Sequence, residues 1–368
     1  MQAVSNGAAP RDAALTRLRF FLIGWVILYH LDLPLRVSAE LPWLAPLLGH
    51  GYLGVDGFFL LSGYALFLGY GSRPPQGWAG FWGFLRRRFA KIWPLHALAL
   101  FALAGLVAAA SAAGAGIRNP ERFGAVEFIL QLSLVNAWET TGIHAWNYPS
   151  WALSVEWAGY LAFPLVLAGV LKLPRPLVWL LPMLGMAGLA WLSGWVPEGG
   201  LNRTLHLGLV RFGLEFAVGL GLGRLAAEGR LPRALLWPVV AALPLGLWLG
   251  EDALAVLGLA ALVPALHRPG VAAAGRPGAA ARPDLLLRLG EASFGIYLCW
   301  VFIEAGLVAV LRLGQPALAG RIGLMLAGFL ASLVAGWLAW RFIEVPAHAW
   351  LLRRGRGPAA PAGASAAR

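Results

Sequence analysis

Long apolar segments divide the chain, and their lengths are close to what an α-helix needs to cross a bilayer. One crossing takes about 20 consecutive apolar residues, and by this criterion the 368-residue sequence contains about ten such segments. Charged residues make up only 12% of the chain, against about 25% in soluble domains. We therefore predict an all-α, polytopic membrane protein with about ten transmembrane helices. The predicted spans cover residues 15–36, 50–71, 90–112, 150–171, 176–196, 204–226, 233–250, 252–267, 290–311 and 320–343.

The placement of Lys and Arg indicates the orientation of these spans. Such residues accumulate in short cytoplasmic loops, and with a cytoplasmic amino terminus most of the 29 Lys and Arg residues fall on the inner side. This distribution predicts that both termini are cytoplasmic. The cytoplasmic (inner) membrane is the expected location. The distribution also accounts for the net charge of +12 without nucleic acid as a partner. Residues 1–352 are predicted to form one transmembrane domain, and residues 353–368 a disordered cytoplasmic tail.

Two connections between the predicted spans are long. The outer connection, 113–149, contains the amphipathic segment GAVEFILQLSLVNAW, which is predicted to lie in the interface or to re-enter the bundle. The inner connection, 268–288, is rich in Ala, Pro, Gly and Arg and is predicted to be a flexible loop. The single cysteine, Cys299, excludes an intrachain disulfide, and no spacing of His and carboxylate residues predicts a metal site.

Two ionisable residues bracket the first span, in the sequence RFFLIGWVILYH. In an α-helix, Arg19 and His30 lie on one face, about three turns and about 16 Å apart. Ionisable groups inside a membrane helix are costly unless they face a bundle interior, so they are functional candidates by default. His30 is the leading catalytic candidate. The alternative is that its imidazole only forms a hydrogen bond to a neighbouring helix.

Two carboxylates are predicted to lie at a depth similar to that of His30. Asp56 and Glu156 both occur near the outer ends of spans that enter from outside. An imidazole oriented by a carboxylate can act as a general base toward a hydroxyl, or can itself carry an acyl group. Asp56 and Glu156 are therefore candidates for the orienting carboxylate, although Asp56 can equally stabilise the start of its own helix.

A basic cluster marks the start of the third span. It consists of Arg86, Arg87, Arg88 and Lys91. The cluster can be a topology signal, or it can bind the phosphates of an acyl donor, because Arg groups match phosphate oxygens. We predict the second role, with Arg19 contributing from the first span.

Further polar residues occur in the later spans. Arg211 and Glu215 have the i, i+4 spacing of an internal ion pair, and Arg341 and Glu344 are predicted to pair near Pro346, where the last regular helix ends. The remaining candidates are assigned a structural or acceptor-side role: Trp151, Ser154, Arg211, Glu215, Tyr297 and Glu344.

Taken in order, these segments resemble the acyltransferase 3 family of integral-membrane acyltransferases. The resemblance depends on the Arg19 and His30 pair and on the following motifs: GVDGFFLLSGY at 54–64, RRFAKIWP at 87–94, PSWALSVEW at 149–157, RFGLEFAVG at 211–219, LGEASFGIYL at 289–298 and FIEVP at 342–346.

The resemblance implies a ten-span enzyme that transfers an acyl group, commonly acetyl from acetyl-coenzyme A, to a sugar hydroxyl. It also implies that Arg19 and His30 are needed for activity, that Arg88 and Lys91 belong to the family's basic motif, and that Glu156 is the acid of the fourth-span motif.

The sequence departs from the family pattern at three places. Lys91 stands where Arg is common, and a second Glu and a Gln of the fourth-span motif are replaced by Trp157 and Ala158. The His that often follows the ninth-span motif is absent, because Cys299 and Trp300 follow it here.

The sequence as a whole predicts a membrane O-acyltransferase with no bound cofactor and with acyl-coenzyme A, most simply acetyl-coenzyme A, as co-substrate. A sugar or glycan is the predicted acceptor, and the oligomeric state stays open. The alternative is a transporter of a glycan, a lipid-linked sugar or an organic anion, although the sequence shows no inverted repeat. A non-catalytic membrane scaffold is a third alternative.

Overall fold

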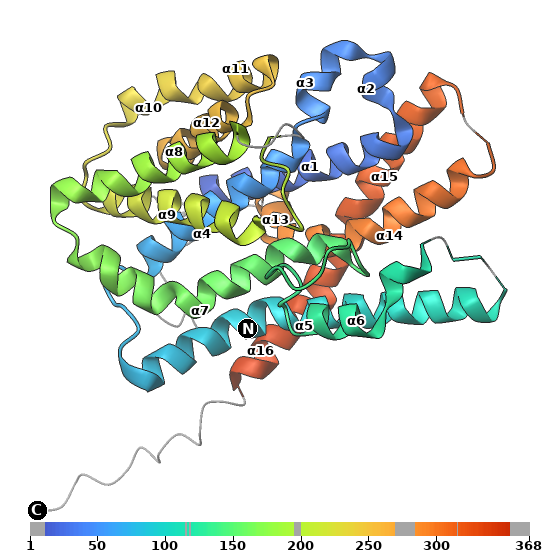
Figure 1. The fold of residues 1–368 in the computed structure, drawn as a ribbon, viewed down its shortest axis with the longest axis horizontal. Helices are drawn as coiled ribbons and strands as arrows, with labels where there is room; N and C mark the ends of the chain where they lie inside the picture. Colours follow the sequence, from blue (N-terminus) through green and yellow to red (C-terminus); the bar gives the residue numbers. More distant parts are fainter. Residues whose placement is uncertain are drawn as a thin grey trace, which may run out of the picture.

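The protein is helical wherever its structure is described. The computed structural model describes residues 12–114, 116–117, 119–194, 200–268, 284–314 and 316–353, and all regular structure in these ranges is helical (Figure 1). The predicted all-α class is thereby confirmed for these residues. Residues 354–368 of the predicted tail and residues 269–283 of the predicted flexible loop lie outside the described residues.

The helices of the first half include the elements that carry Arg19, His30, Asp56 and the basic cluster. Their bounds are α1 Ala13–Leu35, α2 Val37–Glu40, η1 Pro42–Leu44, α3 Ala45–Leu48, η2 Gly51–Leu53, α4 Gly54–Tyr70, α5 Gly77–Ala112, η3 Pro120–Phe123, α6 Ala125–Leu132, η4 Tyr148–Ser150 and α7 Trp151–Lys172.

The second half begins with a short 3₁₀ segment and ends with a π-helical turn between two α-helices. The bounds are η5 Arg175–Trp179, α8 Leu180–Gly194, α9 Gly208–Ala227, α10 Arg233–Val240, α11 Ala242–Leu249, α12 Asp252–Leu266, α13 Leu285–Glu291, α14 Ser293–Leu311, α15 Leu318–Ala339, the π-helical η6 Trp340–Glu344 and α16 Val345–Arg353.

Among the described residues, seven helical segments are long and apolar enough to cross a membrane. They are Ala13–Leu35, Pro42–Tyr70, Gly77–Ala112, Tyr148–Lys172, Arg175–Gly194, Ser293–Leu311 and Leu318–Arg353. Each coincides with a predicted span, so the protein is a multi-pass membrane protein.

The three other predicted spans are also helical, but each departs from a regular apolar crossing. The α9 helix carries Arg211, Glu215 and Arg224, the span 233–250 is split into α10 and α11, and α12 has only 15 residues. A 15-residue helix rises about 22 Å, which is less than the roughly 30 Å of a hydrocarbon core. The number of crossings and the orientation of the termini stay predictions.

Two predicted boundaries were wrong. The predicted loop 268–288 includes the start of α13, where Asp284 caps the helix by accepting a hydrogen bond from the backbone N–H of Leu286. The last helix does not end at Pro346 but continues through η6 and α16 to Arg353. Pro346 directly follows the π-helical turn η6, and local π-helical adjustments re-satisfy the backbone groups that a proline frees in a membrane helix.

The first helix lies inside the array and packs against α4, α13, α14 and α15 (Figure 1). Its neighbour α4 packs closely against α9, because Gly63 and Gly219 face each other. A Cβ at Gly63 would collide with the backbone oxygen of Phe216, and one at Gly219 with that of Leu60. Close helix approach at small residues is typical of membrane helices, and this contact brings Asp56 and Arg211 together.

The outer connection folds back onto α5. The predicted amphipathic segment forms α6, and Trp93 of α5 donates a hydrogen bond to the carbonyl of Leu132. His96, which is fully buried, contacts the carbonyl of Gln131 at 2.8 Å through Nε2. These contacts hold residues 120–150 against the bundle and place η4 beside α1 and α14.

Candidate active site

A cavity of about 280 Å³ opens beside the carboxyl-terminal half of α1. Aromatic rings and hydrogen-bonding groups share its wall, which suits a ligand that is fixed by a few polar contacts on an otherwise apolar surface. Its lining includes Tyr29, His30, Tyr52, His144, Tyr148, Trp151, Asn202, Thr204, Arg211 and Tyr297.

His30 lies in the wall of this cavity with its ring held on two sides. The imidazole stacks on the indole of Trp300 at a centroid distance of 4.1 Å and an interplanar angle of 22°. Its Nδ1 lies 3.2 Å from the hydroxyl of Tyr148. These contacts fix both the plane and the rotation of the ring. The imidazole thus contacts two elements, α14 through Trp300 and η4 through Tyr148.

The hydroxyl of Tyr148 also reaches a carboxylate on α14. It donates a hydrogen bond of 3.1 Å to Glu304, and the guanidinium of Arg122 lies 5.7 Å from the centre of the Tyr148 ring. Sequence reasoning missed Tyr148 and Trp300 as partners of His30, and Glu304 as a partner of Tyr148. Glu304 could have been selected by the same criterion as Glu156, because both are acidic residues inside predicted spans. Tyr148 directly precedes the PSWALSVEW motif.

His144 supplies a second imidazole to the cavity. Its Nε2 lies 2.7 Å from the hydroxyl oxygen of Thr204. Partial burial and then the positive charge of Arg122 lower the pKa of His144 below its usual value, so its ring is neutral at neutral pH.

Asp56 forms its main contacts with Arg211. The guanidinium donates to both carboxylate oxygens, from Nε at 3.1 Å and from Nη2 through a shorter bond, and both residues are fully buried. The predicted ion pair between Arg211 and Glu215 is confirmed, with 3.5 Å between Nε and Oε1. Asp56 thus compensates the charge of Arg211, a buried cation that belongs to the cavity lining.

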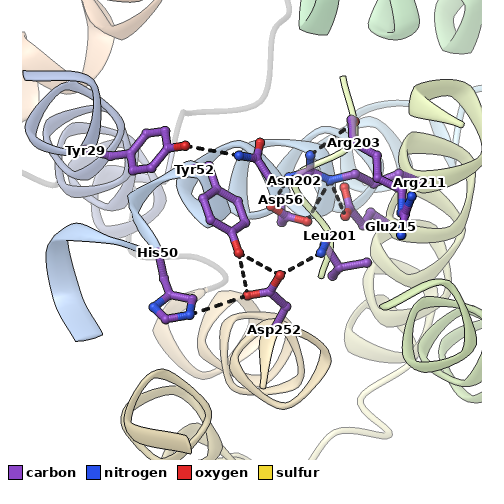
Figure 2. A network of polar contacts seen from close by, with 10 residues as sticks. All are labelled: Tyr29, His50, Tyr52, Asp56, Leu201, Asn202, Arg203, Arg211, Glu215 and Asp252. Carbon is purple, nitrogen blue, oxygen red and sulfur yellow. Dashed lines mark hydrogen bonds and ion pairs between the residues drawn. The ribbon is translucent and has the colours of Figure 1, made fainter. Parts of the chain in front are cut away.

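A third carboxylate, that of Asp252, lies beside the ion pairs of Arg211 with Asp56 and Glu215 (Figure 2). Asp252 accepts hydrogen bonds from the hydroxyl of Tyr52 at 2.8 and 2.7 Å and from the backbone N–H of Leu201 at 2.6 Å. Asn202 donates to the hydroxyl of Tyr29 at 3.0 Å. Because Tyr29, Tyr52 and Asn202 all line the cavity, these bonds fix part of its polar wall.

Glu156 occupies a different environment. It accepts hydrogen bonds from Ser62 at 3.0 Å and from the buried Tyr160 at 2.5 Å. Its carboxylate therefore connects α4 with α7. The hydrogen bonds of Glu156 in the described residues are to Ser62 and Tyr160, and its role in orienting His30 stays a prediction.

Three other predicted candidates position the outer connection or the cavity wall. The hydroxyl of Ser154 donates to the carbonyl of Leu134, and the ring of Trp151 lies 5.4 Å from the guanidinium carbon of Arg211. The hydroxyl of Tyr297 donates to the carbonyl of Pro149 at 2.8 Å.

The residues of the basic cluster differ in their contacts. Arg86 donates to the carbonyls of Leu351 and Leu352, at 3.3 and 2.7 Å, and is thereby engaged with α16. Lys91 forms an ion pair with the buried Glu344. The sequence analysis predicted Arg341, and not Lys91, as the partner of Glu344.

Arg88 has the contacts most suited to an anion. Its guanidinium carbon lies 5.4 to 5.5 Å from the ring centres of Tyr70, Phe84 and Tyr160. Its one hydrogen bond in the described structure is a long one, 3.4 Å to the hydroxyl of Tyr70, and its Nε is buried without a partner there. The exposed Arg87 lies beside the same ring of Tyr70.

Arg19 and His30 both lie against α14. Arg19 donates to the hydroxyl of Ser293, the first residue of α14, at 3.2 Å, whereas His30 stacks on Trp300 further along the same helix. The predicted common face of Arg19 and His30 is therefore confirmed.

The helices and the cavity define an integral-membrane protein with a fixed imidazole in a cavity lined by aromatic, apolar and polar residues. The family model described as an acyltransferase domain matches residues 12–341. The acyltransferase MdmB of Streptomyces mycarofaciens is 31% identical over 340 residues, which cover 83% of this chain and 82% of that protein. No solved structure is significantly similar. The chain belongs to the acyltransferase 3 family and is an acyltransferase enzyme, as the ordered motifs predicted.

Proposed function

We propose that the protein transfers an acyl group from acyl-coenzyme A, most simply acetyl, to a hydroxyl group of a sugar or glycan at the cytoplasmic membrane. The observation that carries this proposal is the fixed His30 imidazole in the wall of the cavity. A volume of about 280 Å³ is close to the lower end, roughly 300 Å³, of small-ligand sites. The aromatic rings and hydrogen-bonding groups of the lining suit a sugar.

The donor is proposed to bind with its phosphates at Arg88, Arg87 and Arg19. Arg88 supports this placement because its buried Nε lacks a partner and its guanidinium is held by three aromatic rings. The structural contacts of Arg86 and Lys91 give them a supporting role. The separation of Arg19 and His30 along α1, about 16 Å, suits an elongated donor whose phosphates and thioester lie at opposite ends.

His30 then removes the proton from the acceptor hydroxyl while the hydroxyl oxygen attacks the thioester carbonyl. The new carbon–oxygen bond forms, the carbon–sulfur bond breaks, and the imidazolium returns the proton to the thiolate. The products are an ester and free coenzyme A. In a second route, His30 carries the acyl group before the hydroxyl attacks. Mass spectrometry of protein quenched after incubation with donor alone distinguishes the routes, because only the second one leaves an acyl adduct on His30.

The proposal is tested with purified protein in lipid nanodiscs, labelled acetyl-coenzyme A and a glycan fraction from the cell surface. Label should appear in the glycan, and His30→Ala should reduce transfer at least about 100-fold. His206→Ala is the matched control because His206 is exposed, contacts Glu139 and is not among the residues that line the cavity. Full transfer by His30→Ala would refute the proposed role. Glycan flux without donor consumption would indicate the transporter alternative, which the family membership disfavours.

A further inference from the structure

Three separate segments meet at the hydroxyl of Tyr148. Tyr148 begins η4, His30 belongs to α1 and Glu304 to α14. The hydroxyl oxygen lies 3.2 Å from Nδ1 of His30 and 3.1 Å from Oε2 of Glu304. A single hydroxyl therefore links the imidazole to a carboxylate that the proposed reaction does not otherwise use.

The proton count of this hydroxyl limits the arrangement to two possibilities. A tyrosine hydroxyl has one proton to donate, and its oxygen can also accept. If the proton points to an ionised Glu304, the oxygen accepts a hydrogen bond from Nδ1–H of His30. If it points to His30 instead, Nδ1 has no proton and Glu304 must be protonated to satisfy the hydroxyl oxygen.

The charge of Arg122 supports the first arrangement. Arg122 lies over the Tyr148 ring, so its positive charge is close to the residue whose hydroxyl contacts Glu304. A nearby cation favours the ionised form of a carboxylate. The stacked Trp300 holds the plane of the imidazole in which Nδ1 contacts Tyr148.

We propose that Glu304 and Tyr148 are positioning residues that hold His30 in the tautomer protonated on Nδ1 and leave the lone pair on Nε2 as the proton acceptor. The catalytic meaning of this inference rests on the proposed function, because only proton transfer at His30 makes its tautomer matter for the rate. Fixing a histidine tautomer through the nitrogen that does not react is a general device in acid–base catalysis.

A purely structural role of the same contacts makes a different prediction. The Tyr148 hydroxyl would then only tie η4 to α1 and α14, and its loss would reduce the amount of folded protein without changing the state of the imidazole. Measurements of the tautomer and of kcat on the folded fraction separate the two roles.

The tautomer is measured directly by nitrogen NMR of protein labelled with ¹⁵N-histidine in nanodiscs, above the pH at which histidine is protonated. The chain has seven His residues, and the signals that disappear in His30→Gln belong to His30. Wild-type protein should show a protonated Nδ1 and an unprotonated Nε2. In Glu304→Gln the new amide can donate to the Tyr148 oxygen, which frees the hydroxyl proton for Nδ1, so the opposite tautomer should increase.

Kinetics provide the second measurement. In Glu304→Gln and Tyr148→Phe, kcat should fall at least about tenfold, as for other groups that orient a functional histidine, whereas KM for the acyl donor should stay unchanged. Tyr64→Phe is a matched control because the Tyr64 hydroxyl is buried without a partner in the described structure. Glu251→Gln, at an exposed residue that forms no side-chain cap, is the second control.

The outcomes separate this inference from the proposed function. Wild-type tautomer signals and wild-type kcat in both Glu304→Gln and Tyr148→Phe would overturn the inference. If Tyr148→Phe does not fold, the isosteric variant Glu304→Gln tests the inference alone, through the tautomer of His30 and through kcat. If wild-type protein transfers no acyl group, the proposed function fails, while the NMR measurement still decides whether Glu304 and Tyr148 set the tautomer.

Discussion

Arg211 of α9 donates two hydrogen bonds to Asp56 of α4, and both side chains are fully buried. Glu215 lies one turn further along α9, 3.5 Å from the same guanidinium, and its carboxylate oxygens have no hydrogen-bond partner in the described structure. Two carboxylates thus share one cation in the interior. Because Asp56 makes the bidentate contact, it is the main compensating charge.

Asp56→Asn should therefore destabilise the protein more than Glu215→Gln. Removing one partner of a buried ion pair costs about 3–5 kcal/mol, whereas neutralising Glu215 removes an excess negative charge and leaves the bond between Arg211 and Asp56 intact. Thermal unfolding of the purified variants in one detergent checks the order. A larger loss in Glu215→Gln would show that Asp56 is not the main partner.

The sequence predicted the helical segments well, because each depends on local composition. All ten predicted spans coincide with helices, and the common face of Arg19 and His30 follows from helical periodicity alone. The ion pair of Arg211 and Glu215 was predicted for the same reason, since its spacing lies within one helix.

The sequence did not predict which groups meet between helices. Depth in the membrane made Asp56 and Glu156 candidates for orienting His30, but depth does not specify the side of a helix or its neighbours. The contacts of His30 with Tyr148 and of Tyr148 with Glu304 span more than 100 residues of chain. Such pairs depend on how the helices pack, and no local pattern in a single sequence records that.

Arg88 should contribute more to donor binding than Arg86. Arg88→Lys removes the planar group that the three rings hold and the buried Nε donor, and loss of one charge-assisted hydrogen bond corresponds to about a tenfold weaker donor affinity. Arg86→Lys should change donor affinity less, because Arg86 contacts backbone carbonyls of α16. Calorimetric titration with acetyl-coenzyme A measures both. Arg73→Ala, at an exposed residue, is the control, and equal effects of the Arg88 and Arg86 variants would contradict the assignment.

Lys91 and Glu344 should be coupled in stability. They form an ion pair between α5 and η6, and Glu344 is buried, so either single change leaves one buried or partly buried charge without its partner. The double variant Lys91→Met with Glu344→Gln should be less destabilised than the sum of the single variants. Residues in contact show interaction energies of about 0.5–3 kcal/mol in such cycles. Additive losses in unfolding free energy would show that the pair contributes no coupling.

His144 should make the protein less stable in acid. Its folded-state pKa is lowered from the usual 6.5 by burial and by the charge of Arg122, so the unfolded chain binds the proton more readily than the folded protein. The contribution of His144 to stability is then complete above about pH 6.5 and is lost as the pH falls from there through the lower folded-state pKa. Arg122→Gln should raise the titration midpoint of His144, followed by NMR of labelled histidine, and His144→Gln should make unfolding less sensitive to acid. A midpoint that does not move in Arg122→Gln would show that Arg122 has no influence on the imidazole.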